Sequence, residues 1–156
     1  MGGALWTASS ACGAPEIVDR TAREVLTPVE LNCGDTLRFT LKNGGVRTLA
    51  LEETGCEIIE RPPLQGMVYG FSCRVRVDGH PLALTRVVGA QESFCEPLVI
   101  NGMRLWFDMA LCVFDKIPMR YPGTGNLRQR PHKDARFAVQ DAALPLCPQP
   151  MRPWYP

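Results

Sequence analysis

The sequence predicts an all-β protein, an antiparallel β-sandwich or jelly-roll-like barrel of about nine short strands with little helix. Three observations support this fold class. Short stretches alternate between apolar and polar residues, and turn signals separate them at intervals of roughly ten residues. Of the 156 residues, 14 are glycine and 14 are proline, as tight connections require. The apolar content of 46% is sufficient for the core of one domain.

Two β-hairpins are the clearest local elements. In residues 34–55, apolar and polar residues alternate on both sides of an NGG turn. In residues 67–88, a DG turn joins MVYGFSCRVRV to HPLALTRVV. Asn-Gly and Asp-Gly favour two-residue hairpin turns because these residues tolerate a positive φ. Both segments are therefore predicted to be antiparallel strand pairs.

Shorter strands are expected before and after these hairpins. They cover residues 25–31, 56–60, 92–100, 103–114 and 135–142. The run MRLWFDMALCVF at 103–114 could also form a short helix, although its aromatic and β-branched residues favour a strand. Residues 15–24 could form one or two helical turns.

The chain divides into three parts. Residues 1–24 form a partly irregular N-terminal segment, residues 25–147 the β-sandwich domain, and residues 148–156 an extended, proline-rich tail. The N-terminus lacks the pattern of a signal peptide, and no apolar run is long enough to span a membrane. Localisation stays open, and an extracellular location is compatible with a processed or excised domain.

Positive charge is concentrated in one region. The formal net charge is only +1, which makes a nucleic-acid partner unlikely for the molecule as a whole. Residues 1–115 hold fourteen acidic and ten basic residues, whereas residues 116–136 hold one acidic and six basic residues. This region includes a long loop at 117–131, and loops of this length are usually functional or disordered.

The basic region predicts a site for a carbohydrate or another anionic ligand, because guanidinium groups bind carboxylates, sulfates and phosphates. Aromatic residues in the tail could stack on a sugar ring or contact a protein partner. The predicted ligand-binding residues are Arg120, Tyr121, Arg128, Arg130, Lys133, Arg136, Trp154 and Tyr155.

A structural interpretation of the same residues is that the cations pair with acidic residues elsewhere in the domain. The candidate acids are Glu52, Glu53, Glu57 and Glu60. In this interpretation, the tail folds back over the domain and covers a sheet edge.

A metal site is the second hypothesis. The chain has two histidines, His80 and His132, and Asp134 would lie on the same side of a strand as His132. Two histidines and one carboxylate are an adequate ligand set for a single divalent metal, as in cupin-like jelly-roll enzymes. This site requires that the two segments meet in the fold. Otherwise His80 is a turn residue and His132 a solvated loop residue.

Asp108 is the weak candidate for a catalytic residue. It lies within the apolar run LWFDMAL, where a carboxylate is costly unless it is hydrogen-bonded or ion-paired. A buried acid of this kind could act as a general acid or base. The structural alternative is that Asp108 bonds to the backbone or to an arginine.

The seven cysteines are spread along the chain, and no two lie within four positions of each other. This spacing excludes zinc knuckles and a Cys-x-x-Cys redox motif. Cys73 and Cys112 lie in apolar stretches and are expected to be buried. One or two disulfides and the redox compartment are left open.

These observations favour a non-catalytic β-sandwich module that needs no cofactor and binds carbohydrate or another anionic ligand. Such a module could be an accessory domain of a larger hydrolase. The first alternative is a small metal-dependent jelly-roll enzyme. The second alternative is a structural assembly subunit that pairs through its tail or a sheet edge.

Overall fold

The computed structural model confirms the all-β fold class. It describes residues 13–59, 68–88, 96–116 and 130–146. Within these ranges, nine strands form two sheets, with strand orders β1-β3-β4-β5-β6 and β2-β9-β8-β7. The strands are β1 (Ile17–Thr21), β2 (Thr27–Leu31), β3 (Thr36–Thr40), β4 (Val46–Ile59), β5 (Val68–Val77), β6 (His80–Val88), β7 (Leu98–Ile100), β8 (Met103–Ala110) and β9 (Ala135–Asp141). A short helix, α1 (Val113–Lys116), follows β8.

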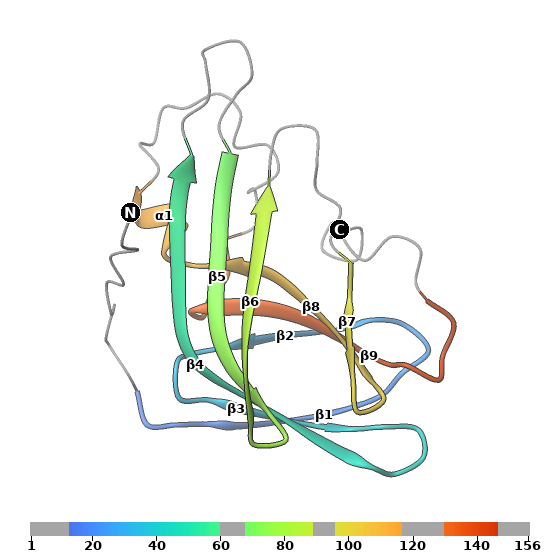
Figure 1. Cartoon of the computed structure of the whole chain (residues 1–156). Helices are drawn as coiled ribbons and strands as arrows, with labels where there is room; N and C mark the ends of the chain where they lie inside the picture. The colour runs from blue at the N-terminus through green and yellow to red at the C-terminus, as the bar shows by residue number, and fades with distance from the viewer. Residues whose placement is uncertain (1–12, 60–67, 89–95, 117–129, 147–156) are drawn as a thin grey trace.

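The larger sheet bends around the smaller one. Figure 1 shows β2, β8 and β9 running across β4, β5 and β6, whereas β1 and β3 lie below them. The 14-residue strand β4 takes part in both arms of the bend, because it pairs with β3 along its first part and with β5 as far as its end. A register shift between Leu51 and Glu53 marks a β-bulge in β4. Bulges bend strands in this way at the corners of orthogonally packed sheets.

The main core lies between the two sheets. Phe107 of β8 and Phe137 of β9 pack with ring centroids 5.5 Å apart and face Phe39 and Leu49 of the larger sheet within one buried cluster. Every residue of β9 is buried, so this strand is covered on both faces. Cys73 is buried in the main core as expected, and Cys112 packs against it. Burial raises the pKa of the Cys73 thiol, which keeps it protonated.

The predicted turn at Asp78-Gly79 is confirmed, and Asn101-Gly102 forms a second turn of the same kind between β7 and β8. Asp78 and Gly79 have φ angles of 48° and 82°, and Asn101 and Gly102 have φ angles of 49° and 79°. Two successive positive φ angles are the mark of a type I′ turn, whose twist matches that of the flanking strands. The two turns are joined, because the amide of Asn101 donates to the carboxylate of Asp78 at 2.8 Å.

The helical turns considered for residues 15–24 do not form. Residues 17–21 form β1, which pairs in parallel with β3. The β-branched residues Ile17, Val18 and Thr21 favour a strand, and Val18 is buried at 7% exposure. The larger sheet therefore includes residues that were assigned to the N-terminal segment.

Three other boundaries differ from the expectations. The expected strand at 56–60 is the last part of β4 rather than a separate strand. Of the expected strand at 92–100, residues 92–95 lie outside the described residues, and β7 begins at Leu98. The run at 103–114, for which a strand or a short helix was considered, contains both. The strand β8 ends at Ala110, and the helix α1 begins at Val113.

The turn at residues 78–79 yields a test of the fold. Gly79 has a positive φ, and an added Cβ would meet no atom within 4 Å, so an alanine there is strained by the backbone alone. We expect Gly79→Ala to lower the free energy of unfolding by about 1–2 kcal/mol, measured by urea denaturation. Gly13→Ala is the control, because Gly13 has equal space and no left-handed φ. Equal effects of the two substitutions would contradict the turn geometry.

Candidate functional site

The structure separates the predicted ligand-binding residues. Five of them lie outside the described residues: Arg120, Tyr121, Arg128, Trp154 and Tyr155. Arg130 is exposed, and its guanidinium carbon lies 5.8 Å from the centroid of the Phe114 ring. Because the remaining two, Lys133 and Arg136, are ion-paired within the domain, the described residues do not form one basic patch.

Lys133 connects the two sheets. Its ammonium lies 2.6 Å from Oε2 of Glu16 and 3.1 Å from Oδ2 of Asp35, both of which belong to the larger-sheet side. The hydrogen bond to Glu16, assisted by Asp35, raises the pKa of Lys133. Lys133 therefore pairs with acidic residues of the domain, as the structural interpretation predicted. These acids are Glu16 and Asp35 rather than the four glutamates that were expected. Glu52 and Glu53 instead pair with Arg76 and Arg74 on the exposed face of the larger sheet.

Asp108 and Arg136 form a buried ion-pair network with Arg86. The carboxylate of Asp108 is 2.6 Å from Nη1 of Arg86 and 2.5 Å from Nε of Arg136. All three side chains are at most 7% exposed. Arg136 is therefore buried beside an acid rather than presented to a ligand, and Asp108 follows the structural alternative given for it. Arg104 does not pair with Asp108 and instead donates to Gln140 and to the carbonyl of Leu144.

The residues of the metal hypothesis do not form a metal site. Among the described residues, no group of three or more His, Cys, Asp and Glu side chains is placed to hold a metal ion. His80 begins β6 at the edge of the larger sheet, whereas His132 precedes β9 of the smaller sheet. Asp134 has a structural role, because its Oδ2 accepts the backbone N–H of Cys33 at 2.8 Å. The two histidines are both exposed, as the alternative interpretation expected.

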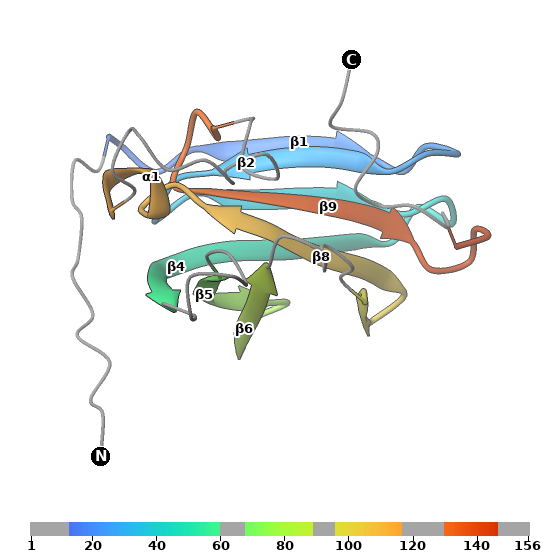
Figure 2. The ribbon, with the colours of Figure 1, turned by 90° about the horizontal axis from the view of Figure 1, so that it is seen from above.

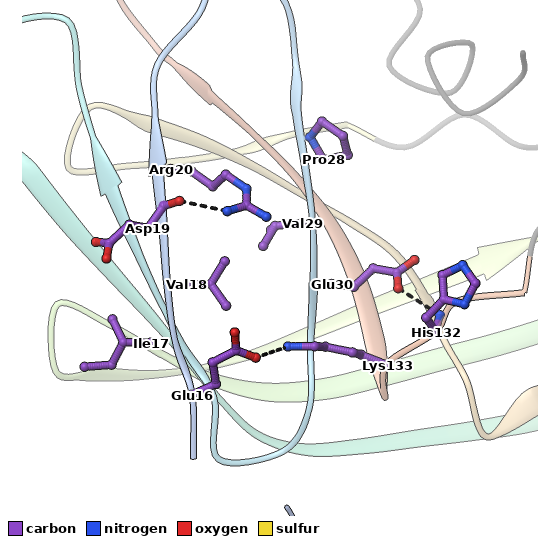
Figure 3. A pocket seen from close by; sticks show the side chains of 10 residues that line it. All are labelled: Glu16, Ile17, Val18, Asp19, Arg20, Pro28, Val29, Glu30, His132 and Lys133. Atoms are coloured by element: carbon purple, nitrogen blue, oxygen red, sulfur yellow. Dashed lines mark hydrogen bonds and ion pairs between the residues drawn. The ribbon is translucent and has the colours of Figure 1, made fainter. Parts of the chain in front are cut away.

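A cavity of about 540 Å³ lies between the edge strands β1 and β2. Its size is in the range typical of ligand pockets. Figure 3 shows Arg20 of β1 extending toward Val29 of β2, and Lys133 reaching Glu16 at one end. The buried side chains of Val18 and Val29 form an apolar floor. The lining residues are Glu16, Ile17, Val18, Asp19, Arg20, Pro28, Val29, Glu30, His132 and Lys133.

Every second residue of β1 directs its backbone N–H and C=O groups toward this cavity. The carbonyl of Glu16 accepts the N–H of Thr36, and the N–H of Ala22 donates to Thr40, so the even-numbered residues of this segment bond to β3. In a parallel ladder, the odd-numbered residues then direct their N–H and C=O groups away from β3. Because β1 is the edge of its sheet, the polar groups of residues 17, 19 and 21 face the open side.

Among the residues that the structure describes, Arg20 is the one arginine that lines the cavity. Its Nη1 donates to the carbonyl of Asp19 at 2.8 Å, and no carboxylate among the described residues pairs with it. The carboxylate of Asp19 is held by Arg38 on the other side of the strand, which lowers the pKa of Asp19. Arg20 therefore directs N–H groups into the cavity, and the carboxylate of a ligand could accept hydrogen bonds from them.

At the end of the cavity away from Arg20, hydrogen bonds and ion pairs within the protein close the opening. The carboxylate of Glu30 accepts the backbone N–H of His132 at 2.8 Å. The ammonium of Lys133, which also contacts Glu16, donates to the carboxylate of Asp35. Burial raises the pKa of Asp35, but hydrogen bonds from two backbone N–H groups and from Lys133 outweigh burial and lower it below its usual value. The carboxylate of Asp35 is therefore ionised at neutral pH and fixes this end.

Sequence reasoning missed Glu16, Arg20 and Glu30. Glu16 and Arg20 lie in a segment for which helical turns were considered. Glu30 lies in a predicted strand, but the sequence does not indicate which strand lies beside it. One signal was present, because IVDRT contains three β-branched residues in five positions.

The chain matches no protein-family model, no curated protein and no solved structure. In the described part of the chain, no helix has the length and apolar character needed to cross a membrane.

The ion-pair network makes Asp108 a stability residue. Asp108→Asn removes the charge that two buried guanidinium groups share, and we expect the free energy of unfolding to fall by about 3–5 kcal/mol. Denaturant unfolding followed by fluorescence measures this change. Asp115→Asn, at an exposed position of α1, is the control and should change stability by no more than about 0.5 kcal/mol. Similar values for the two variants would contradict a structural role for Asp108.

The lowered pKa of Asp35 predicts a pH dependence. The stabilisation from the ionised carboxylate is fully present above the unfolded-state pKa of about 3.9 and is lost as the pH falls through the lower folded-state pKa. The stability difference between the unchanged protein and Asp35→Asn should therefore be constant near neutral pH and shrink below about pH 4. Urea denaturation at a series of pH values measures this difference. A difference that does not change with pH would contradict the prediction.

Proposed function

We propose that this chain is a non-catalytic β-sandwich binding module whose ligand is an extended peptide that carries a carboxylate side chain. The observation that carries the proposal is the cavity between β1 and β2, which Arg20 enters without a carboxylate partner among the described residues. The proposal keeps the module class expected from the sequence. It moves the site from the basic loop to the edge of the sandwich.

Backbone geometry favours a peptide over a small anion. The outward N–H groups of residues 17, 19 and 21 and the outward carbonyls of residues 17 and 21 form the open side of a strand, and an added strand would bond to them. The carbonyl of Asp19 accepts a hydrogen bond from the Arg20 guanidinium, which an added strand would replace. The edge of β2 is less suited to strand addition than that of β1, because Pro28 has no backbone N–H to donate. A peptide laid along β1 would cover the apolar floor of Val18 and Val29.

The side chains of the cavity favour an acidic peptide over a sugar. None of the described residues that line it is aromatic, and sugar rings are usually bound by stacking on aromatic side chains. At the closed end, Lys133 is already neutralised by Glu16 and Asp35. Arg20 is therefore the cation that would select a carboxylate, and Glu30 on the β2 wall would disfavour a second one nearby.

The test is a titration of isotope-labelled full-length protein with a short capped peptide of alternating valine and threonine that has one central aspartate. We expect the amide signals of Ile17, Asp19 and Thr21 to shift, because their N–H groups gain a partner. The amides of Val18 and Arg20, which face β3, should shift less. No shift along β1 at millimolar peptide would overturn the proposal.

The substitution Arg20→Gln tests how much the positive charge of Arg20 contributes to peptide binding. It should weaken binding of the aspartate peptide about tenfold, as expected for the loss of a charge-assisted hydrogen bond, and leave binding of the matching asparagine peptide unchanged. Arg23→Gln is the matched control, because Arg23 is exposed and does not line the cavity. Equal effects of the two substitutions would show that Arg20 does not select the ligand.

A further inference from the structure

The open edge of β1 presents five residues to the peptide of the proposed function, on which this inference rests. A strand added at this edge pairs its residues one by one with residues 17–21. Paired residues on neighbouring strands direct their side chains to the same face of the sheet and contact each other. Each residue of β1 therefore has one neighbour in the ligand, and its chemistry decides which residue type is preferred there.

The first selective position lies opposite Arg20. Val18 and Ala22 are buried, so alternation along the strand directs the side chain of Arg20 to the same inner side. Figure 3 shows this side chain extending into the cavity toward Val29. No carboxylate among the described residues pairs with its guanidinium, which donates to a backbone carbonyl instead. The preferred ligand residue at this position is therefore acidic.

The second selective position lies opposite Ile17. The side chain of Ile17 is 58% exposed although it belongs to a strand, and it lines the cavity. It points to the other face of the sheet from Arg20, because the two residues are three positions apart. An aliphatic residue beside it on an added strand would cover apolar surface that now contacts water. The preferred ligand residue at this position is therefore aliphatic.

The other three positions select weakly. Val18 is only 7% exposed and offers little further surface to a ligand. The carboxylate of Asp19 already accepts two hydrogen bonds of 2.8 Å from Arg38, so its charge is neutralised within the sheet. Thr21 is exposed and polar. The preference of this edge therefore depends on one acidic and one aliphatic residue, three positions apart.

The backbone favours an antiparallel ligand. Antiparallel pairs are slightly more stable per residue than parallel pairs. The outward N–H groups belong to residues 17, 19 and 21, so Arg20 would lie at a non-hydrogen-bonded position of an antiparallel pair. At such positions the paired Cα atoms are only about 4.5 Å apart and the side chains are closest. The acidic residue of an antiparallel ligand would thus lie next to the stem of Arg20 and within reach of its guanidinium.

We propose that the ligand runs antiparallel to β1 and carries an acidic residue followed, three positions later, by an aliphatic residue. In this direction the acid pairs with Arg20 first, and the aliphatic residue pairs with Ile17 at the end of the strand. There Lys133 crosses from the smaller sheet to Glu16 and closes the cavity, as Figure 3 shows. The aliphatic residue is therefore the last one that the cavity admits.

The first test compares two capped peptides of identical composition, Thr-Asp-Thr-Ala-Val-Thr and its reversed sequence, by titration of the labelled full-length protein. The forward peptide should bind at least about fivefold more tightly, because the reversed one loses either one of the two contacts or the antiparallel ladder. Equal or tighter binding of the reversed peptide would overturn this proposal alone. If neither peptide binds, and the central-aspartate peptide does not bind either, the proposed function fails as well.

A spin label reports the direction independently of affinity. Placed at the amino end of the forward peptide, it should broaden the amide signals of Thr21 and of Thr40, which pairs with Thr21 on β3. Placed at the carboxyl end, it should instead broaden those of Ile17 and its partner Thr36. The opposite assignment of the two ends would show a parallel ligand and overturn the proposal.

The substitution Ile17→Thr tests the aliphatic position and keeps a β-branched residue in the strand. It should weaken binding of the forward peptide about threefold, as expected for one cross-strand pair, and leave unchanged the binding of the same peptide with threonine in place of valine. Val25→Thr is the matched control, because Val25 is 61% exposed and does not line the cavity. Equal effects of the two substitutions would exclude Ile17 as a selective residue and overturn the proposal.

Discussion

The fold depends on one buried carboxylate. Asp108 of β8 is held by Arg86, which extends from β6 of the larger sheet, and by Arg136 of β9 in its own sheet. The register shift between Phe107 and Met109 places a bulge at Asp108, and bulges re-aim side chains. A carboxylate at 3% exposure is tolerated only with such partners. Removing one partner would leave the others charged and buried, so the network fixes how β6 lies on β8.

On the opposite side of the sandwich, the described residues form no comparable connection along its length. Between β1 and β2, the ion pairs of Lys133 with Glu16 and Asp35 join the two sheets near one end. The rest of the seam stays apart and forms the cavity. Figure 2 shows β1 and β6 at opposite sides of the molecule, so the firmly joined side and the open side are well separated. A ligand could therefore occupy the open side without disturbing the buried network.

The sequence predicts local structure better than it predicts the site. The hairpins were predictable because DG and NG turns and period-two alternation are local signals. The strand β1 was missed because its three β-branched residues are a weak signal, and its parallel pairing with β3 cannot be deduced from the sequence. The partner of Lys133 could not be found, since Glu16 lies 117 residues away. The local excess of basic residues predicted an anion site, but ion pairs with distant acids neutralise Lys133 and Arg136.

The order of the strands also governs when the sheets can form. The strands β3 to β6 follow one another and pair with their chain neighbours, so the larger sheet can begin to form as soon as they are synthesised. In contrast, the partner of β2 among the described strands is β9, and the bond between Glu30 and His132 spans 102 residues. At about 5–20 residues per second, β2 waits on the order of ten seconds on the ribosome for its partner. During that interval both of its edges are open, and Pro28, which cannot donate to a ladder, protects the nascent chain from pairing with another.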